Sequence, residues 1–158
     1  MATRTLVVLR HAKSDWSGGE PDRERPLGRR GRRQAPEAGQ WLAGNIPEID
    51  LAVVSPATRT LSTWELVAAE LDAVPEMRVD ERVYAAWARE LREIVDELPD
   101  EATTVVLVGH NPGTEDLVQE MAGESVEMPT SAIAVLTWDG SWSDAGSARL
   151  VTSGRPPT

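Results

Sequence analysis

The sequence has 158 residues, a size that fits one compact domain with its own hydrophobic core. Its formal net charge is −10, from 16 basic and 26 acidic residues, which argues against general binding to nucleic acid or to anionic membranes. It contains no cysteine, so neither a disulfide framework nor a thiolate metal site can form. No signal-like segment and no run of about 20 apolar residues occurs, so we expect a cytoplasmic protein.

Four apolar runs have the length of strands and no alternation with polar residues: Thr5–Leu9, Leu51–Val54, Thr104–Val108 and Ile133–Trp138. Continuous apolar strands of this kind suit a parallel sheet that is covered on both faces. A turn signal, Asp139-Gly140-Ser141, follows the fourth run, so we expect Ala148–Val151 to return as an edge strand.

Amphipathic helical patterns fill segments between these runs: Thr58–Leu71, Trp87–Leu98 and Thr114–Ala122. The stretch Gly28–Leu42 also has a helical pattern, but Pro36 cannot sit inside a helix without a kink, so we expect two pieces. The alternation of strands and helices predicts an α/β layered fold. We expect one domain over residues 1–153 and a flexible tail over residues 154–158.

The two histidines of the chain each follow a predicted strand directly, His11 after the first and His110 after the third. Arg10 precedes His11, and Arg59 follows the second predicted strand closely. Ligands of open parallel sheets bind beyond the carboxyl ends of the strands. The sequence therefore predicts that four side chains meet at one edge of the sheet: Arg10, His11, Arg59 and His110.

Three kinds of site could use two histidines and two arginines. Zinc requires three or four ligands, the chain has no further histidine or cysteine, and arginines would repel the cation. A Ser-His-Asp hydrolase is the second alternative, but no Gly-x-Ser-x-Gly elbow occurs. Phosphate chemistry fits best, because arginine forks match phosphate oxygens and a neutral imidazole is a competent nucleophile. We expect the arginines to keep His11 neutral by charge repulsion, and we expect no metal or cofactor to be needed.

The motifs around these residues resemble those of the histidine phosphatase superfamily, which includes the phosphoglycerate mutases. The Arg-His signature reads Leu9-Arg10-His11-Ala12, with alanine where the signature has glycine. Further motifs resemble the SixA-type phosphohistidine phosphatases: Arg25-Pro26-Leu27, Ser55-Pro56-Ala57-Thr58-Arg59-Thr60, Gly109-His110-Asn111-Pro112 and Thr130-Ser131-Ala132. The resemblance covers nearly the whole chain. It implies a phosphoglycerate mutase-like fold, a three-layer α/β/α sandwich with a mostly parallel central sheet.

The same resemblance implies a role for each site residue. His11 is the nucleophile that becomes phosphorylated, and three residues surround the phosphoryl group: Arg10, Arg59 and His110. Ser17 lies where relatives often place a small polar contact to phosphate, although a loop hydroxyl that caps a local turn explains it equally well. The backbone N–H of Asn111, where a strand leads into a helix, is a further candidate phosphate donor.

One departure from the mutase-like members concerns the general acid. Those members carry a glutamate that protonates an alkoxide leaving group, whereas the equivalent stretch 83–87 holds no carboxylate. Glu81 and Glu90 lie nearby without matching the pattern, and we interpret them as surface charges. Phosphohistidine does not need this acid, because its imidazole can leave already protonated. We therefore predict a phosphatase that removes phosphoryl groups from phosphohistidine in proteins through a covalent phospho-His11 intermediate.

Two alternatives remain open at this point. One is a phosphomonoesterase of the same superfamily that acts on a small molecule, and the other is a phospho-ligand binding module without turnover. The expected partner is accordingly a phosphorylated protein or a small phosphorylated substrate, and the sequence does not fix the oligomeric state.

Residues 23–33 form a basic island in this acidic chain, with six arginines: Arg23, Arg25, Arg29, Arg30, Arg32 and Arg33. A solvated helix face is the ordinary interpretation of such a run. The alternative is a rim that attracts an anionic substrate.

Overall fold

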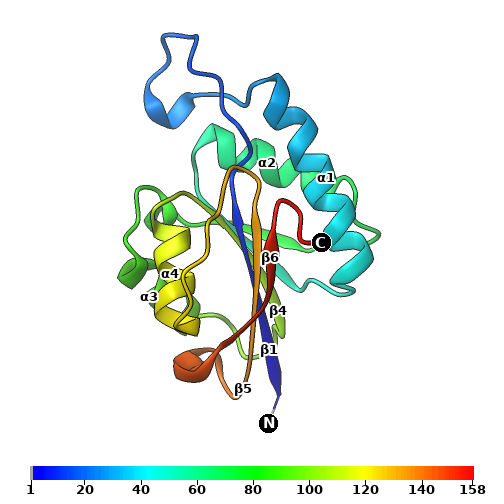
Figure 1. The fold of residues 1–158 in the computed structure, drawn as a ribbon, viewed down its shortest axis with the longest axis vertical. Coiled ribbons are helices and arrows are strands. Elements are labelled where there is room, and N and C mark those ends of the chain that lie inside the picture. The colour runs from blue at the N-terminus through cyan, green and yellow to red at the C-terminus, as the bar shows by residue number, and fades with distance from the viewer. Residues whose placement is uncertain (1) are drawn as a thin grey trace.

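A six-stranded sheet forms the middle layer of the molecule (Figure 1). In the computed structural model, which describes residues 2–158, its strands are β1 (Thr3–Arg10), β2 (Leu51–Val54), β3 (Glu76–Val79), β4 (Thr104–Gly109), β5 (Ile133–Asp139) and β6 (Arg149–Gly154). Their order across the sheet is β3-β2-β4-β1-β5-β6. The first four of these are parallel to one another, while β5 runs antiparallel to β1 and β6 antiparallel to β5. The predicted mostly parallel sheet is confirmed.

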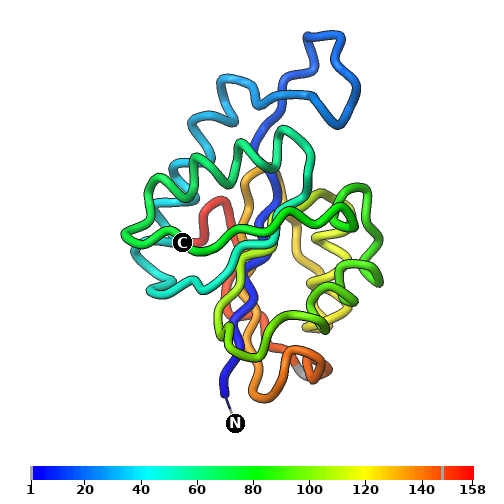
Figure 2. Tube along the Cα trace, turned by 180° about the vertical axis from the view of Figure 1, so that it is seen from behind, coloured from blue at the N-terminus to red at the C-terminus, as the bar shows by residue number. Residues whose placement is uncertain are grey.

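Four helices cover the sheet: α1 (Arg29–Asn45), α2 (Thr58–Ala68), α3 (Ala88–Asp96) and α4 (Gly113–Ala122). Helices α1 and α2 pack on one face and α3 and α4 on the other, as the opposite views of Figures 1 and 2 show. Three short 3-10 helices lie in the connections: η1 (Asp22–Glu24), η2 (Glu81–Val83) and η3 (Trp142–Ser147). The molecule is the three-layer α/β/α sandwich that the sequence predicts.

Strand β1 shows why both faces of the sheet are covered. Val7 and Leu9 are fully buried in the core that includes α1 and α2, whereas Leu6 and Val8 are fully buried in the core that includes α3 and α4. Successive side chains of a strand point to opposite faces. An apolar run without polar alternation therefore requires a helix layer on each side.

Helix α1 differs from the prediction at Pro36. It runs unbroken over its whole range with Pro36 inside, so the prediction of two pieces is wrong. Proline removes the N–H that would bond the carbonyl four residues earlier, which is that of Arg32. Arg32 is exposed, so water can bond this carbonyl, while Ala35 and Ala38 on the other side of the helix stay buried in the core.

Two ends of the sheet also differ from the expectations. No strand is predicted over β3, because its sequence lacks the continuous apolar run of a buried strand. In the structure its four residues are exposed, yet it pairs in parallel with β2. At the C-terminus, β6 forms where the edge strand is expected and extends to Gly154, and Pro157 is buried. Gly154 therefore belongs to a strand, and the flexibility expected of residues 154–158 stays a prediction.

Candidate active site

Three parallel strands end at the same edge of the sheet and carry the predicted site residues there. Arg10 ends β1 beside Gly109, the last residue of β4, so His11 and His110 follow side by side. Their imidazole rings have centroids 5.3 Å apart. Arg59 enters from the first turn of α2, which follows β2. The structure thus brings together the four residues that the sequence predicts to meet.

His11 is held with one defined ring nitrogen free to react. Its Nδ1 lies 2.7 Å from the carbonyl oxygen of Ala12, and because a carbonyl only accepts, Nδ1 carries the proton. The lone pair is therefore on Nε2. The pKa of His11 is lowered to about 4: burial is the main cause, the bond to Ala12 opposes it, and the charges of Arg59 and Arg10 act in the same direction as burial. The ring is neutral at pH 7 as expected, but burial contributes more to this than the arginines do.

His110 is neutral for similar reasons. Its pKa is lowered to about 3, mainly by burial, with repulsion from His11 when that ring is protonated and from Arg59 acting in the same direction. Its Nε2 lies 2.7 Å from the hydroxyl oxygen of Ser55, while its Nδ1 is buried without a partner. If the Ser55 hydroxyl donates to Nε2, the unpartnered Nδ1 carries a proton that is available to a ligand.

Five buried side-chain atoms of residues 2–158 have no hydrogen-bond partner: Nε of Arg10, Arg25 and Arg59, Nδ1 of His110 and Oγ of Ser131. All five belong to residues that lie near His11. The charge of Arg25 lowers the pKa of His11, and the backbone N–H of Ser131 donates to the His11 carbonyl at 2.9 Å. Nearly all buried polar groups in proteins are bonded. A concentration of unbonded donors beside one imidazole therefore indicates a site for an anion.

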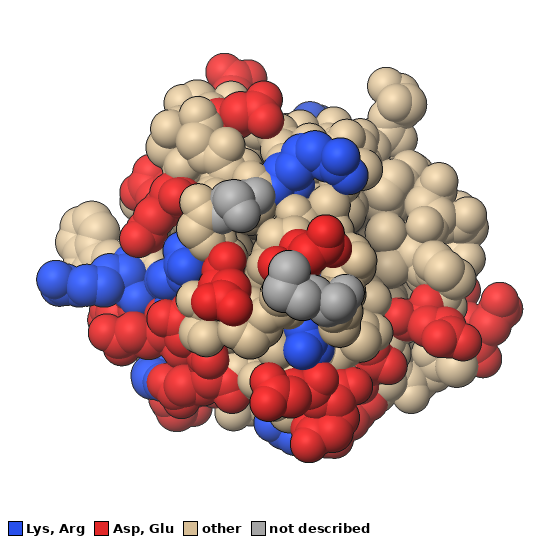
Figure 3. Space-filling view, turned by 90° about the horizontal axis from the view of Figure 1, so that it is seen from below, with Lys and Arg blue, Asp and Glu red and all other residues tan. Residues whose placement is uncertain are grey.

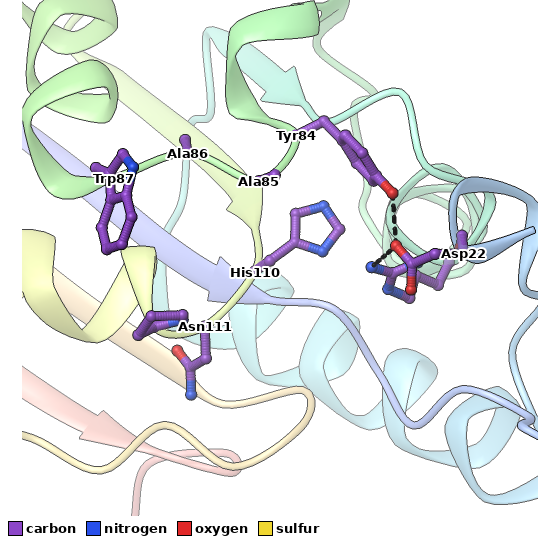
Figure 4. Close-up of a pocket in the computed structure, with 9 residues that line it drawn as sticks. Asp22, Tyr84, Ala85, Ala86, Trp87, His110 and Asn111 are labelled. Atoms are coloured by element: carbon purple, nitrogen blue, oxygen red, sulfur yellow. Dashed lines mark hydrogen bonds and ion pairs between the residues drawn. The ribbon is translucent and has the colours of Figure 1, made fainter.

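A cavity of about 320 Å³ opens beside His110 (Figure 4). Its lining comes from four segments of the chain: Asp22, Arg59, Tyr84–Trp87 and His110–Pro112. In Figure 4 Asp22 and Trp87 lie on opposite sides of His110. The ring of Tyr84 packs edge-on against His110, with centroids 5.7 Å apart. The cavity is thus bounded by a carboxylate on one side and an indole on the other.

The Asp22 carboxylate reaches this cavity from η1, and sequence analysis missed it. It accepts hydrogen bonds from the Tyr84 hydroxyl at 2.5 Å, from Arg25 at 3.0 Å and from Arg59 at 3.2 Å. The Tyr84 hydroxyl and then Arg25 are the main groups that hold the pKa of Asp22 far below its usual range. Asp22 is therefore ionised at neutral pH and has no proton to donate to a leaving group.

The two glutamates near the expected acid position are engaged at the surface. Glu81 pairs with Arg23 at 2.7 Å, and both side chains are largely exposed. Glu90 accepts a hydrogen bond from the backbone N–H of Trp87 at 2.8 Å and so caps the start of α3. Neither lines the cavity, which agrees with their interpretation as surface charges.

The segment 84–87 is held against α4 by a close backbone approach. A Cβ at Gly113 would lie 2.5 Å from the carbonyl oxygen of Ala86, so only glycine fits there. Ala85 adopts a φ of 55°, a left-handed conformation that costs a non-glycine residue free energy. These two features place Trp87 beside the cavity, and neither Tyr84 nor Trp87 carries a sequence pattern that predicts this position.

The structure does not bring Ser17 into the cluster. Its N–H and hydroxyl both donate to the Asp15 carboxylate, at 2.8 and 2.6 Å, and its side chain is exposed. This geometry is the local turn cap that was the alternative explanation for Ser17.

Asn111 does line the cavity, but its side chain is engaged elsewhere. The amide donates to the carbonyl of Met128 at 2.8 Å, and its oxygen accepts from the Thr114 hydroxyl. Only the backbone of Asn111 is left for a ligand, and phosphate binding by its N–H stays a prediction.

One threonine joins the two elements that carry His11 and Arg59. The Thr63 hydroxyl on α2 accepts from the backbone N–H of Ala12 at 2.9 Å and donates to the backbone carbonyl of Arg59 at 2.7 Å. It is fully buried, so both bonds are shielded from water. The backbone after His11 and the backbone at Arg59 are therefore held in one arrangement.

Searches of the described residues for two other features are negative. Over residues 2–158, no group of three or more histidine, aspartate or glutamate side chains is placed to hold a metal ion. Within the same range, no helix combines the length and apolar character that crossing a bilayer requires.

Comparison with known proteins identifies the family. The family model of the histidine phosphatase superfamily (branch 1) matches residues 6–130. The chain belongs to this superfamily. An uncharacterised protein of Mycobacterium tuberculosis (strain ATCC 25618 / H37Rv) is 39% identical over 90% of this chain and 96% of its own. An uncharacterised chloroplastic protein of Arabidopsis thaliana is 31% identical over 90% of this chain and 71% of its own.

Solved structures of histidine phosphatases agree with the fold. A structure from Nakamurella multipartitia, provisionally described as a phosphohistidine phosphatase SixA, has a TM-score of 0.87 and 29% identity, and covers 98% of this chain and 96% of its own. The protein histidine phosphatase SixA complexed with tungstate has a TM-score of 0.83 and 25% identity, and the match covers 94% of this chain and 95% of that one. A mycobacterial glucosyl-3-phosphoglycerate phosphatase, at 21% identity and a TM-score of 0.72, shares the fold. The family and these neighbours support a phosphatase.

Proposed function

We propose that this histidine phosphatase removes the phosphoryl group from phosphohistidine side chains of proteins, with His11 as the covalent nucleophile. The observation that carries the proposal is the group of unbonded buried donors around His11, which a phosphoryl group would satisfy. The SixA neighbours support the choice of phosphohistidine. Tungstate, bound in one of them, is an oxyanion like phosphate.

Binding would use the donors that the free site leaves unbonded. Arg10 and Arg59 supply guanidinium donors to the phosphoryl oxygens, and His110 supplies the N–H of Nδ1. These groups are already in place at the ends of β1, α2 and β4. Phosphoryl transfer depends mainly on positioning and on stabilising the charge of the transferred group, so a preformed cradle of this kind lowers its barrier.

The reaction would proceed in two displacements. The lone pair of His11 Nε2 attacks phosphorus, and the P–N bond to the substrate imidazole breaks with its electron pair going to the leaving nitrogen. A substrate ring protonated on its other nitrogen departs as neutral imidazole, so no general acid is required. Water then attacks phospho-His11, which releases inorganic phosphate and restores the free His11 ring.

Two properties of the cavity favour phosphohistidine over an alkyl phosphate. The only carboxylate among its lining residues is Asp22, which is ionised, so an alkoxide leaving group would find no proton donor there. Its volume of about 320 Å³ is at the lower end of the range for small-molecule sites, which suits a phosphoryl group with one small ring. The negative charge of Asp22 would also stabilise the positive charge of the protonated substrate ring before the P–N bond breaks.

Rates on three substrates test the proposal. A phosphohistidine peptide, p-nitrophenyl phosphate and 3-phosphoglycerate differ in how much protonation their leaving groups need. We expect kcat/KM to fall in that order, with acid-labile phosphate trapped on His11 for the first two. A preference for 3-phosphoglycerate would favour a small-molecule phosphomonoesterase, and tight binding of all three without turnover would favour a binding module.

A further inference from the structure

Acidic side chains outnumber basic ones at one end of the molecule. On the face at the amino ends of the parallel strands, Asp and Glu side chains are more frequent than Lys and Arg among many uncharged residues (Figure 3). Asp50 and Glu101 precede β2 and β4 at this end, and Asp139 closes the antiparallel β5 there. His11 and His110 lie at the opposite end. An anionic partner is therefore repelled from one end of the molecule and admitted at the other.

Four exposed arginines crowd the first turns of α1 at the site end: Arg29, Arg30, Arg32 and Arg33. We call this set the basic turn. Over residues 2–158, no side chain of the basic turn forms an ion pair, although six other arginines do. The first turn of α1 contains no acidic residue either. The basic turn is thus a local excess of positive charge on a chain with a net charge of −10.

This placement of charge does not stabilise the helix. Cations at a helix N-terminus are opposed by the helix dipole, and like charges three or four residues apart repel one another. Arg32 alone makes a hydrogen bond, to the carbonyl of Leu27 at 3.1 Å. Four exposed charges that destabilise their own helix and form no ion pair among the described residues are explained by a partner that the free molecule lacks.

The basic turn is held directly beside the segment that carries the nucleophile. The N–H of Gly28 donates to the carbonyl of Lys13 at 2.9 Å, and the N–H of Lys13 donates to Gln34 at 3.0 Å. A Cβ at Gly31 would lie 2.1 Å from the Lys13 oxygen, so glycine permits this contact. Lys13 is itself exposed and lies two residues after His11. The same end of the molecule therefore presents the site and the basic turn together (Figures 1 and 2).

We propose that the basic turn is a docking surface for protein substrates with acidic residues around the phosphorylated histidine. The proposal rests on the proposed function and adds the chemistry of the partner. A short acidic protein surface matches the small size of the basic turn. A long polyanion or an anionic membrane would extend beyond the turn onto the acidic remainder of the chain.

Two sets of substitutions with the same change in net charge test the docking surface. The first replaces three arginines of the basic turn, as Arg29→Gln, Arg30→Gln and Arg33→Gln. The control replaces three exposed arginines elsewhere, as Arg78→Gln, Arg89→Gln and Arg149→Gln. Three probes are compared: a phosphohistidine peptide flanked by glutamates, the same peptide flanked by glutamines, and phosphoramidate, which has the P–N bond without a peptide.

We expect the wild type to prefer the glutamate-flanked peptide by about tenfold in kcat/KM at low ionic strength, and to lose the preference at high salt. The basic-turn variant should show no preference, the control variant should keep it, and all three proteins should hydrolyse phosphoramidate equally. Equal losses in both variants, or a preference that survives in the basic-turn variant, would overturn the docking surface. Equally tight binding of the wild type to poly(A) RNA or phosphatidylserine vesicles would also overturn it.

Failure of the proposed function gives a different result. In that case neither peptide is hydrolysed, although phosphoramidate or p-nitrophenyl phosphate is. Fluorescence anisotropy of the unphosphorylated glutamate-flanked peptide with the wild type and both variants then decides the docking surface alone. Binding that only the basic-turn variant loses retains it, and binding that is absent or equal in all three rejects it.

Discussion

Strand β1 carries an arginine near each of its ends, and the two side chains are held in different ways. Near the amino end, Arg4 is 6% exposed, and its guanidinium donates hydrogen bonds of 2.7 to 3.0 Å to three backbone carbonyls, those of Asp100, Ala102 and Gly140. At the carboxyl end, Arg10 donates one hydrogen bond, to the carbonyl of Met128 at 3.1 Å, and its Nε has no partner. The Nε and Nη1 atoms of Arg4 are thus both bonded within the folded chain, whereas Nε of Arg10 is buried without a hydrogen-bond partner.

The two arginines of β1 therefore differ in role: Arg4 stabilises the fold, and Arg10 is available to bind a ligand. A buried cation whose donors meet carbonyls joins distant segments of the fold, and its removal leaves those carbonyls unbonded. A partly buried cation with an unbonded buried donor, such as Arg10, contributes little to the fold and can contribute strongly to binding a ligand. The following substitutions test this division, from the largest expected effect to the smallest.

The four residues that meet at the carboxyl ends of the parallel strands form the carboxyl-end cluster: Arg10, His11, Arg59 and His110. Replacing His11 with alanine removes its central side chain. We expect His11→Ala to lower kcat by at least about 10³-fold, because no other imidazole is positioned to accept the phosphoryl group. Rapid quenching should trap acid-labile phosphate on the wild type and none on the variant. A variant that retains wild-type turnover would mean that the cluster only binds phosphate.

Arg4→Met and Arg10→Met form a matched pair across the comparison. We expect Arg10→Met to weaken inhibition by inorganic phosphate about 100-fold with a small change in stability, since a charged donor to the anion is lost while only one hydrogen bond within the fold is removed. Arg4→Met should leave phosphate inhibition unchanged but lower the free energy of unfolding by about 3 kcal/mol, because buried carbonyls lose their donor. Urea denaturation and phosphate inhibition, measured on both variants, would contradict the division if each variant showed both effects.

A substitution of Trp87 tests whether this part of the cavity wall contacts the substrate. We expect Trp87→Ala to lower kcat/KM for a phosphohistidine peptide about tenfold, because the peptide loses an apolar wall. Phosphoramidate, which has no ring to pack, should be hydrolysed as before. Trp16→Ala is the control: Trp16 is 70% exposed against 68% for Trp87 but does not line the cavity. Equal effects of the two variants on the peptide would remove the role assigned to Trp87.

Acid should weaken the fold through the carboxyl-end cluster. The folded pKa values of His11 and His110 are about 4 and about 3, against about 6.5 in an unfolded chain. Between pH 6.5 and 4 the unfolded chain binds protons that the folded chain does not, so stability falls as the pH falls through this window. We expect a loss of about 2 kcal/mol for each of the two histidines from pH 7 to pH 5 by urea denaturation. The double variant His11→Asn/His110→Asn should lose less, and an equal loss would contradict the assignment.

The meeting of the four central residues could be predicted because each follows a strand or begins the next helix. An apolar run predicts a strand, and the carboxyl ends of parallel strands lie at the same edge of the sheet. A residue that directly follows such a run is therefore predicted to lie at that edge. Arg10, His11 and His110 are located by this rule alone. The neutral state of His11 could also be predicted, although its main cause, burial, depends on packing that no local pattern shows.

Asp22, Tyr84 and Trp87 could not be predicted, because no periodic pattern fixes the loops that carry them. Asp22 is held in the cavity by Arg25, Arg59 and Tyr84, which are separated from it by 3, 37 and 62 residues along the chain. Such contacts exist only after the layers have packed. The same limit applies to β3, whose pairing with β2 depends on backbone hydrogen bonds and not on a buried face.

The double hydrogen bond of Thr63 has a consequence for how this protein tolerates change. Ala12 and Thr63 are 51 residues apart in the sequence, yet one hydroxyl sets the distance between the backbone after His11 and the backbone at Arg59. The length of the chain between them, which includes all of α1, does not set that distance. Insertions and deletions in the intervening loops can therefore change the shape of the entrance to the site and the partners that it binds. The spacing between His11 and Arg59 stays the same, because the Thr63 hydroxyl fixes it.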